Sequence, residues 1–125
     1  MINEYIKIKN KFDGCVVLIK SGVFYYTYAK DASILSFIMK YKMINNRVGF
    51  PISNLEKVLS ILSNIRINVY VDNMLFEYGD MYNIYLDKVN FDNKVKNLIN
   101  LIESKINKDE SFYDKLVLFM GEVDE

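Results

Sequence analysis

One stretch, residues 21–32 (SGVFYYTYAKDA), constrains the fold more than any other part of this chain. An apolar run over residues 16–20 ends at Ser21-Gly22, and a second run, rich in aromatic and β-branched residues, follows over 23–28. Glycine accepts the positive φ that a tight turn requires, so the pattern predicts a β-hairpin connected at Ser21-Gly22. Helical spacing begins at Ala29. The chain is therefore expected to pass from a hairpin directly into a helix.

The second strand of this hairpin has two different faces, because side chains alternate along a strand. Phe24 and Tyr26 share one face, whereas Val23, Tyr25 and Thr27 share the other. One face can line the core. The other face then carries a row of aromatic side chains that is available as a contact surface.

Length and composition indicate an ordinary globular protein. The chain has 125 residues, of which 51% are apolar and 26% charged, and this length predicts a single domain over 1–125. Its apolar runs fall far short of the ~20 residues that span a bilayer, and its first residues lack the apolar core of a signal peptide. These features predict a cytoplasmic protein without a membrane partner.

The residue types that hold metals and cofactors are scarce. Cys15 is the only cysteine and there is no histidine, which excludes an intramolecular disulfide and a Cys/His zinc site. Without a histidine to activate it, Cys15 is expected to be a buried small hydrophobic residue. A Gly-rich phosphate loop is also missing. We therefore expect no metal and no cofactor.

The net charge of zero conceals an asymmetry along the chain. Residues 1–50 contain eight basic and three acidic residues, a net charge of +5, and the remainder carries −5. A basic N-terminal half is suited to nucleic acid or to an acidic protein, and an acidic half to solubility. The alternative is a chance segregation of solvated charges.

Hydrophobic spacing and turn residues predict the remaining elements. Pro51 should end a strand because it cannot donate to a ladder, and Asn45-Asn46 and Asp72-Asn73 are expected to kink or turn the chain. The order of elements predicts an α+β fold with a mixed β-sheet flanked by helices. Helices are predicted over 1–11, 29–42, 53–64, 92–106 and 111–120, and strands over 15–20, 23–28, 43–50, 66–71, 74–78 and 81–89.

Three local signals set boundaries among these elements. Ser53 and Glu56 have the spacing of a capping box, which predicts a helix that starts at Ser53. Gly79-Asp80 is expected to connect the last two strands as a hairpin. Gly121 is expected to stop the last helix.

The N-terminal half carries a series of motifs that can be compared with known families. They are Tyr5, Ile8-Lys9, Val16–Ile19, Gly22–Tyr26, Asp31-Ala32, Val48–Pro51 and Ile67–Val71. The series resembles the N-terminal mismatch-recognition domain, domain I, of the DNA mismatch-repair protein MutS, which has a Gly-Asp-Phe-Tyr-Glu motif followed by an Asp-Ala pair. The resemblance covers residues 4–73. It implies a stand-alone domain, without the connector, lever, clamp and ATPase domains of that family.

The resemblance implies a physical rather than a catalytic role. In that family the motif's Phe is wedged into the base stack beside a mispaired or unpaired base, and the Glu two residues later hydrogen-bonds that base. Unstacking costs a few kcal/mol per base step and costs least where pairing is faulty. Phe24 stands at the wedge position, Tyr26 at that of the Glu and Val23 at that of the Asp. A Tyr side chain can stack or donate a hydrogen bond, but it supplies no carboxylate.

The predicted DNA-contacting residues follow from this comparison and from the charges. Phe24, Tyr25 and Tyr26 are candidates for contact with bases, and the alternative is that they fill the core or half-cover a sheet face. The competing function is a protein-interaction module that retains the fold but has lost mismatch binding, and uses the Tyr-rich face and the C-terminal helices for a partner or for self-association. Candidates for phosphate contact, or else ordinary surface charges, are Lys9, Lys11, Lys20 and Arg47.

A catalytic site is the remaining alternative. Asp72, Glu77, Asp80 and Asp87 cluster around the predicted hairpins, and carboxylates of this kind can hold Mg²⁺ in a nuclease. Carboxylates at turns more commonly serve turn chemistry, and no spacing among these four is diagnostic. The sequence therefore favours a protein that is not an enzyme.

Overall fold

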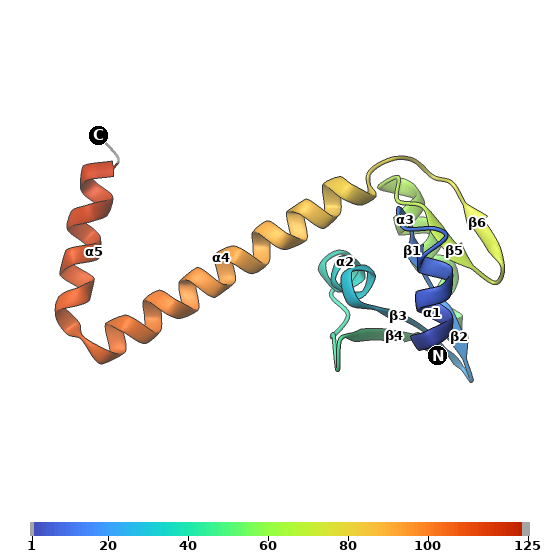
Figure 1. The fold of residues 1–125 in the computed structure, drawn as a ribbon, viewed down its shortest axis with the longest axis horizontal. Helices are drawn as coiled ribbons and strands as arrows, with labels where there is room; N and C mark the ends of the chain where they lie inside the picture. The colour runs from blue at the N-terminus through green and yellow to red at the C-terminus, as the bar shows by residue number, and fades with distance from the viewer. Residues whose placement is uncertain (1, 124–125) are drawn as a thin grey trace. The chain divides into compact units, whose positions relative to one another are not determined.

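The computed structural model describes residues 2–123 (Figure 1). It has the predicted α+β class, with helices and both parallel and antiparallel strand pairs. The contacts group the chain into two compact units, Met1–Val89 and Asn90–Glu125, and the single domain over 1–125 stays a prediction. The elements in chain order are α1 (Ile2–Lys9), β1 (Val16–Val17), β2 (Ile19–Ser21), β3 (Phe24–Tyr28), α2 (Ala29–Met39), β4 (Arg47–Pro51), a 3₁₀ turn (Ile52–Asn54), α3 (Leu55–Asn64), β5 (Val69–Val71), β6 (Met74–Phe76), α4 (Tyr82–Lys108) and α5 (Glu110–Val123).

The strands form two three-stranded sheets in the orders β1-β5-β6 and β2-β3-β4. Only β1 and β5 pair in parallel; the other pairs are antiparallel. Leu18 separates β1 from β2, and its amide still donates to the Tyr70 carbonyl at 2.9 Å. The single strand predicted over 15–20 therefore contributes its first part to one sheet and its second part to the other.

The turns follow the expected residue types closely. In the β2–β3 hairpin Ser21 pairs with Phe24, so the turn lies at Gly22 and Val23, one residue later than predicted, and Gly22 has a φ of 61°. Asn45 and Asn46 have φ values of 52° and 62°. The predicted Asp72-Asn73 turn between β5 and β6 has the same two values and is confirmed.

The main core lies on the sheet face that carries Tyr25, Val48 and Phe50. Helices α2 and α3 and the first turns of α4 cover this face. Helix α1 covers part of the opposite face, where its Tyr5 packs in a smaller cluster with Cys15, Val17, Ile19 and Tyr28. On this face helix α1 therefore covers the end of β3, at Tyr28, and leaves the start of that strand exposed.

Cys15 is buried in the smaller cluster, as the sequence predicts. Burial raises the pKa of its thiol to about 11.

Because the thiolate is the reactive form, we expect Cys15 of the native protein at pH 8 to react with an aromatic disulfide reagent about 100-fold more slowly than Cys15 of the urea-unfolded chain. The folded state holds this proton more tightly, so unfolding should also become easier as the pH rises from about 9 to about 11. Equal rates before and after unfolding, followed by absorbance, would contradict the buried position.

One predicted strand is wrong. Of residues 81–89, Tyr82 to Val89 form the start of α4, which continues through the predicted helix 92–106 without a break. Tyr82 and Val89 are buried in the main core, with Tyr85 and Leu86 packed against it. This spacing places all four on one side of a helix. The β-branched and aromatic composition of the segment favours a strand, but burial of this side decides the structure.

Two predicted helix boundaries also differ from the structure. The capping box at Ser53 does not form, because Ser53 is already part of the 3₁₀ turn and α3 begins at Leu55 without a side-chain cap. Helix α5 continues through Gly121 to Val123, so Gly121 does not stop it. The helix predicted over 1–11 is confirmed as α1.

The second unit contains the rest of α4 and all of α5. Asp109 precedes α5 and accepts hydrogen bonds from the amide and the hydroxyl of Ser111, which hold the pKa of the Asp109 carboxyl below its usual value. Within residues 2–123, none of the helices is both long enough and apolar enough to cross a membrane. Large apolar side chains on these two helices are exposed, among them Phe91, Leu98, Leu101, Leu118 and Phe119.

Candidate nucleic-acid interface

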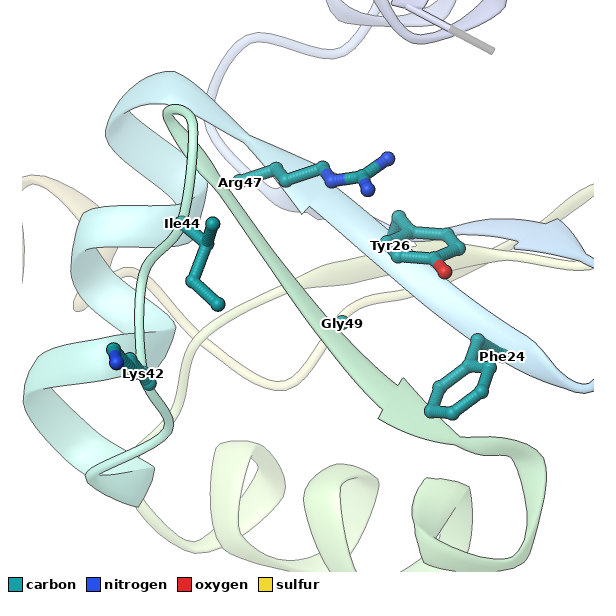
Figure 2. Close-up of a pocket in the computed structure, with 6 residues that line it drawn as sticks. All are labelled: Phe24, Tyr26, Lys42, Ile44, Arg47 and Gly49. Atoms are coloured by element: carbon teal, nitrogen blue, oxygen red, sulfur yellow. The ribbon is translucent and has the colours of Figure 1, made fainter.

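Strand β3 presents Phe24 and Tyr26 on its open face, next to strand β4 (Figure 2). Phe24 is 38% exposed although its neighbour Tyr25 is 2% exposed, so the predicted alternation of an open and a buried face is confirmed. In the β3–β4 ladder Phe24 lies opposite Pro51, and Tyr26 lies opposite Gly49. Strand β4 therefore offers no large side chain directly opposite either ring.

Gly49 allows the Tyr26 ring to lie close to the backbone of β4. A Cβ atom at Gly49 would lie 2.6 Å from Cε1 of Tyr26, which is closer than two non-bonded carbon atoms can approach. The Arg47 guanidinium carbon lies 4.7 Å from the centroid of the Tyr26 ring, which is a cation–π contact. The Phe24 and Tyr26 centroids are 6.0 Å apart with planes tilted by 35°. Arg47, Tyr26 and Phe24 thus form a continuous row, which we call the aromatic row.

A groove of about 210 Å³ opens beside the aromatic row, with Gly49 between its two sides (Figure 2). Lys42 and Ile44 form the side opposite Phe24 and Tyr26. The Asn45-Asn46 turn places Ile44 there, because the amides and carbonyls of Ile44 and Arg47 bond to each other at 2.9 and 3.1 Å. The groove has no acidic lining residue. Among residues 2–123, Lys42 and Arg47 take part in no ion pair.

The structure brings three of the seven predicted DNA-contacting residues together, namely Phe24, Tyr26 and Arg47. Lys42, Ile44 and Gly49 belong to the same groove and were missed by sequence reasoning. Gly49 gives a usable signal, since a glycine inside a strand indicates a close approach by another group. Lys42 and Ile44 gave no signal, because only the turn after them brings them back over β4.

Tyr25 was predicted to contact DNA, but the structure places its side chain in the main core, on the face opposite the aromatic row. Its ring stacks on Phe50 in the main core with centroids 5.9 Å apart, and its hydroxyl donates to Asp72 at 2.8 Å. Burial and the Asp72 contact raise the pKa of Tyr25 to about 12.

Lys20 is exposed but pairs with Tyr25 across the β2–β3 ladder. Directly paired residues share a face, so Lys20 lies on the face opposite the aromatic row. Lys11 is exposed in the turn after α1 and does not line the groove.

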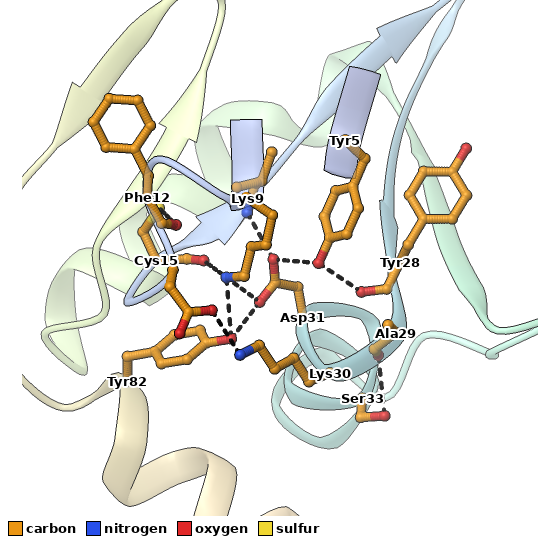
Figure 3. Close-up of polar contacts among 12 residues, drawn as sticks. Tyr5, Lys9, Phe12, Cys15, Tyr28, Ala29, Lys30, Asp31, Ser33 and Tyr82 are labelled. Atoms are coloured by element: carbon orange, nitrogen blue, oxygen red, sulfur yellow. Dashed lines mark hydrogen bonds and ion pairs between the residues drawn. The ribbon is translucent and has the colours of Figure 1, made fainter. Parts of the chain in front are cut away.

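Lys9 was predicted to contact a phosphate. In the structure its ammonium group is buried in a polar network and is not available to a phosphate (Figure 3). It bonds to Asp31 at 2.9 Å, to the hydroxyl of Tyr82 at 3.2 Å and to the carbonyl of Cys15. Tyr5 and Lys9 lie four residues apart on α1 and therefore share one side of that helix. This spacing was the one sequence feature that could have indicated that Lys9 faces inward with Tyr5. No pattern in the sequence indicated that Asp31 is their shared partner.

Asp31 is the centre of this network and is completely buried. Its Oδ1 accepts from Lys9 and from the Tyr82 hydroxyl at 2.5 Å, and its Oδ2 accepts from the Tyr5 hydroxyl at 2.8 Å and the Val17 amide at 3.1 Å. Burial and the neighbouring Asp31 charge raise the pKa of both phenols far above the ordinary value. The network therefore joins α1, β1, α2 and α4 and fixes α1 over the part of the sheet beyond the aromatic row.

An open sheet face with two neighbouring aromatic rings and basic side chains is typical of domains that bind nucleic acid. Among the described residues, Asp72, Glu77, Asp80 and Asp87 included, there is no group of three or more potential ligands that could hold a metal ion. The family model described as MutS domain I matches residues 1–77, and the chain belongs to this family. No match is found among curated proteins.

Proposed function

We propose that this protein is a non-catalytic DNA-binding domain that senses distorted or mispaired duplex DNA through Phe24. The supporting observation is that Phe24 is exposed at the start of β3, on the aromatic row, with no acidic residue beside it. An apolar side chain in this position can enter a base step, and the cost of unstacking is lowest where pairing is already faulty. A cytoplasmic location is part of the same proposal.

The test is fluorescence anisotropy of labelled duplexes that are either perfectly paired or carry one mispair. We expect tighter binding to the mispaired duplex, and we expect Phe24→Ala to remove this preference with a loss of roughly 10-fold in affinity. Phe91→Ala, which truncates an exposed phenylalanine of α4 outside the first unit, is the matched control and should change nothing. Equal binding of both duplexes by the wild type would contradict mismatch sensing.

Ionic strength should affect the binding, because Arg47 and Lys42 flank the groove. If both contact phosphates, the logarithm of the binding constant should fall against the logarithm of salt concentration with a slope of roughly −2. Lys42→Ala should lower the slope by about 1 and weaken binding to paired and mispaired duplexes alike. An unchanged slope would remove Lys42 from the interface.

The second candidate function is a protein-interaction module. The observation in its favour is the set of exposed apolar residues on α4 and α5 within the second unit. Sedimentation velocity over a range of protein concentrations tests it for self-association. A concentration-dependent larger species, together with no binding to any DNA at low salt, would favour this function over the first.

A further inference from the structure

We propose that the groove beside the aromatic row is a stacking site for unpaired bases, so that its preferred ligand is a single-stranded tract of at least two nucleotides. Such a tract occurs as an unpaired loop inside a duplex or as a free single strand, and both present the same chemistry. The proposal rests on the proposed function, because it assumes that DNA meets this face.

The first argument is the arrangement of the two rings. Phe24 and Tyr26 are two residues apart on one strand, on one face, with centroids 6.0 Å apart. Proteins that bind single strands use neighbouring aromatic rings in this way to stack successive bases. A base inside a duplex is already stacked on both faces, and only an unpaired base can turn one face to Tyr26.

The second argument is that Tyr26 is held in place before any ligand arrives. Gly49 gives the ring room against β4, and Arg47 contacts it from the same strand. A ring that is already ordered loses little conformational entropy when a base stacks on it. The groove on the other side of Gly49 stays open, because Lys42 and Ile44 stand across from the ring (Figure 2).

The third argument is the chemistry of the lining. The side chains are two aromatic rings, one aliphatic group and two cations, without a carboxylate or an amide. The cations can pair with phosphates, and the aromatic rings can stack on the face of any base. Side-chain amides and carboxylates, which read the edges of adenine and cytosine, are absent from the lining, and the proposal assigns the two cations to phosphates. Binding should therefore depend on whether a base is unpaired rather than on which base it is.

The experiment compares four labelled DNAs by anisotropy: a perfect duplex, a duplex with one mispair, a duplex with a two-nucleotide unpaired loop, and a free thymidine oligonucleotide. We expect the loop and the free strand to bind roughly 5- to 100-fold more tightly than the perfect duplex, and more tightly than the single mispair. Tyr26→Leu keeps an apolar side chain but removes the ring, and should abolish this gain. Tyr113→Leu, at an exposed tyrosine of α5, is the matched control.

Gly49→Ala provides a second test that removes none of the groove side chains. The added methyl group should force the Tyr26 ring away from β4 and weaken binding of the loop and the free strand by a similar factor. If the single mispair binds as tightly as the loop, and Tyr26→Leu has no effect while Phe24→Ala does, the stacking site is refuted and the wedge function stands. If none of the four DNAs binds at low salt, both are refuted.

Discussion

Asp31→Ala should unfold the first unit or bring it close to unfolding. The substitution leaves the Lys9 ammonium in the interior without its counter-charge, and it leaves the Tyr5 and Tyr82 hydroxyls and the Val17 amide without their shared acceptor. Breaking a buried ion pair by removing one partner costs about 3–5 kcal/mol. A domain of this size has a total stability of only about 5–15 kcal/mol, so the loss is a large fraction of it.

The measurement is urea denaturation, followed both by circular dichroism and by the reactivity of Cys15, which reports on the first unit alone. Asp13→Asn is the matched control, because it breaks the exposed ion pair between Asp13 and Lys30 at 2.7 Å. Exposed pairs contribute less than about 1 kcal/mol, so this variant should remain as stable as the wild type within that margin. Similar losses in the two variants would show that the Asp31 network contributes nothing special.

A double substitution separates the network's charge from its packing. Lys9→Met with Asp31→Leu removes both charges and supplies apolar side chains, and replacement of a buried pair in this way is commonly neutral or stabilising. We expect the double variant to recover most of the stability that Asp31→Ala loses, although the Tyr82 hydroxyl and the Val17 amide still lose their acceptor, whereas the Tyr5 hydroxyl keeps the Tyr28 carbonyl. A double variant as unstable as Asp31→Ala would indicate that the hydrogen bonds to the phenols, rather than the ion pair, dominate.

The parts of the fold that could be predicted are those set by local rules. Alternation along residues 23–28 was enough to separate the open face of Phe24 and Tyr26 from the buried face of Tyr25, and Gly22 was enough to place the hairpin within one residue. The resemblance to MutS domain I rested on this stretch together with other motifs between residues 4 and 73, and the family match over residues 1–77 confirms it. Short-range periodicity therefore accounts for Phe24 and Tyr26, two of the six residues that line the groove.

The rest depended on partners that are distant in the sequence. Lys9 at the end of a charged helix has the appearance of a surface residue, and its role is decided by Asp31 and by Tyr82, which is 73 residues away. The start of α4 was assigned as a strand because its residue types favour one, while the packing of Tyr82 and Val89 against the core favours a helix. In both cases a long-range contact overrides a local preference.

Phe50→Ala should be nearly as destabilising as Asp31→Ala, whereas Phe24→Ala should leave the fold intact. Phe50 is 1% exposed and stacks on Tyr25 and on Tyr41, in each case with centroids 5.9 Å apart. Truncation of a buried phenylalanine to alanine costs about 3–5 kcal/mol, because the lost contacts leave a cavity. Phe24 is partly in solvent and contacts mainly Tyr26, so its truncation should cost less than about 1 kcal/mol.

The contrast between these two phenylalanines decides whether Phe24 serves the fold or the surface. Both belong to the β3–β4 pair, and Tyr25 lies directly opposite Phe50. For a domain of about this size, 1 kcal/mol shifts the melting temperature by about 4–8 °C, so the two variants should differ by well over 10 °C. If Phe24→Ala melts as low as Phe50→Ala, Phe24 is a core residue and its loss of DNA binding would reflect unfolding. If it melts near the wild type, a loss of binding in the same variant is a direct effect of removing the ring.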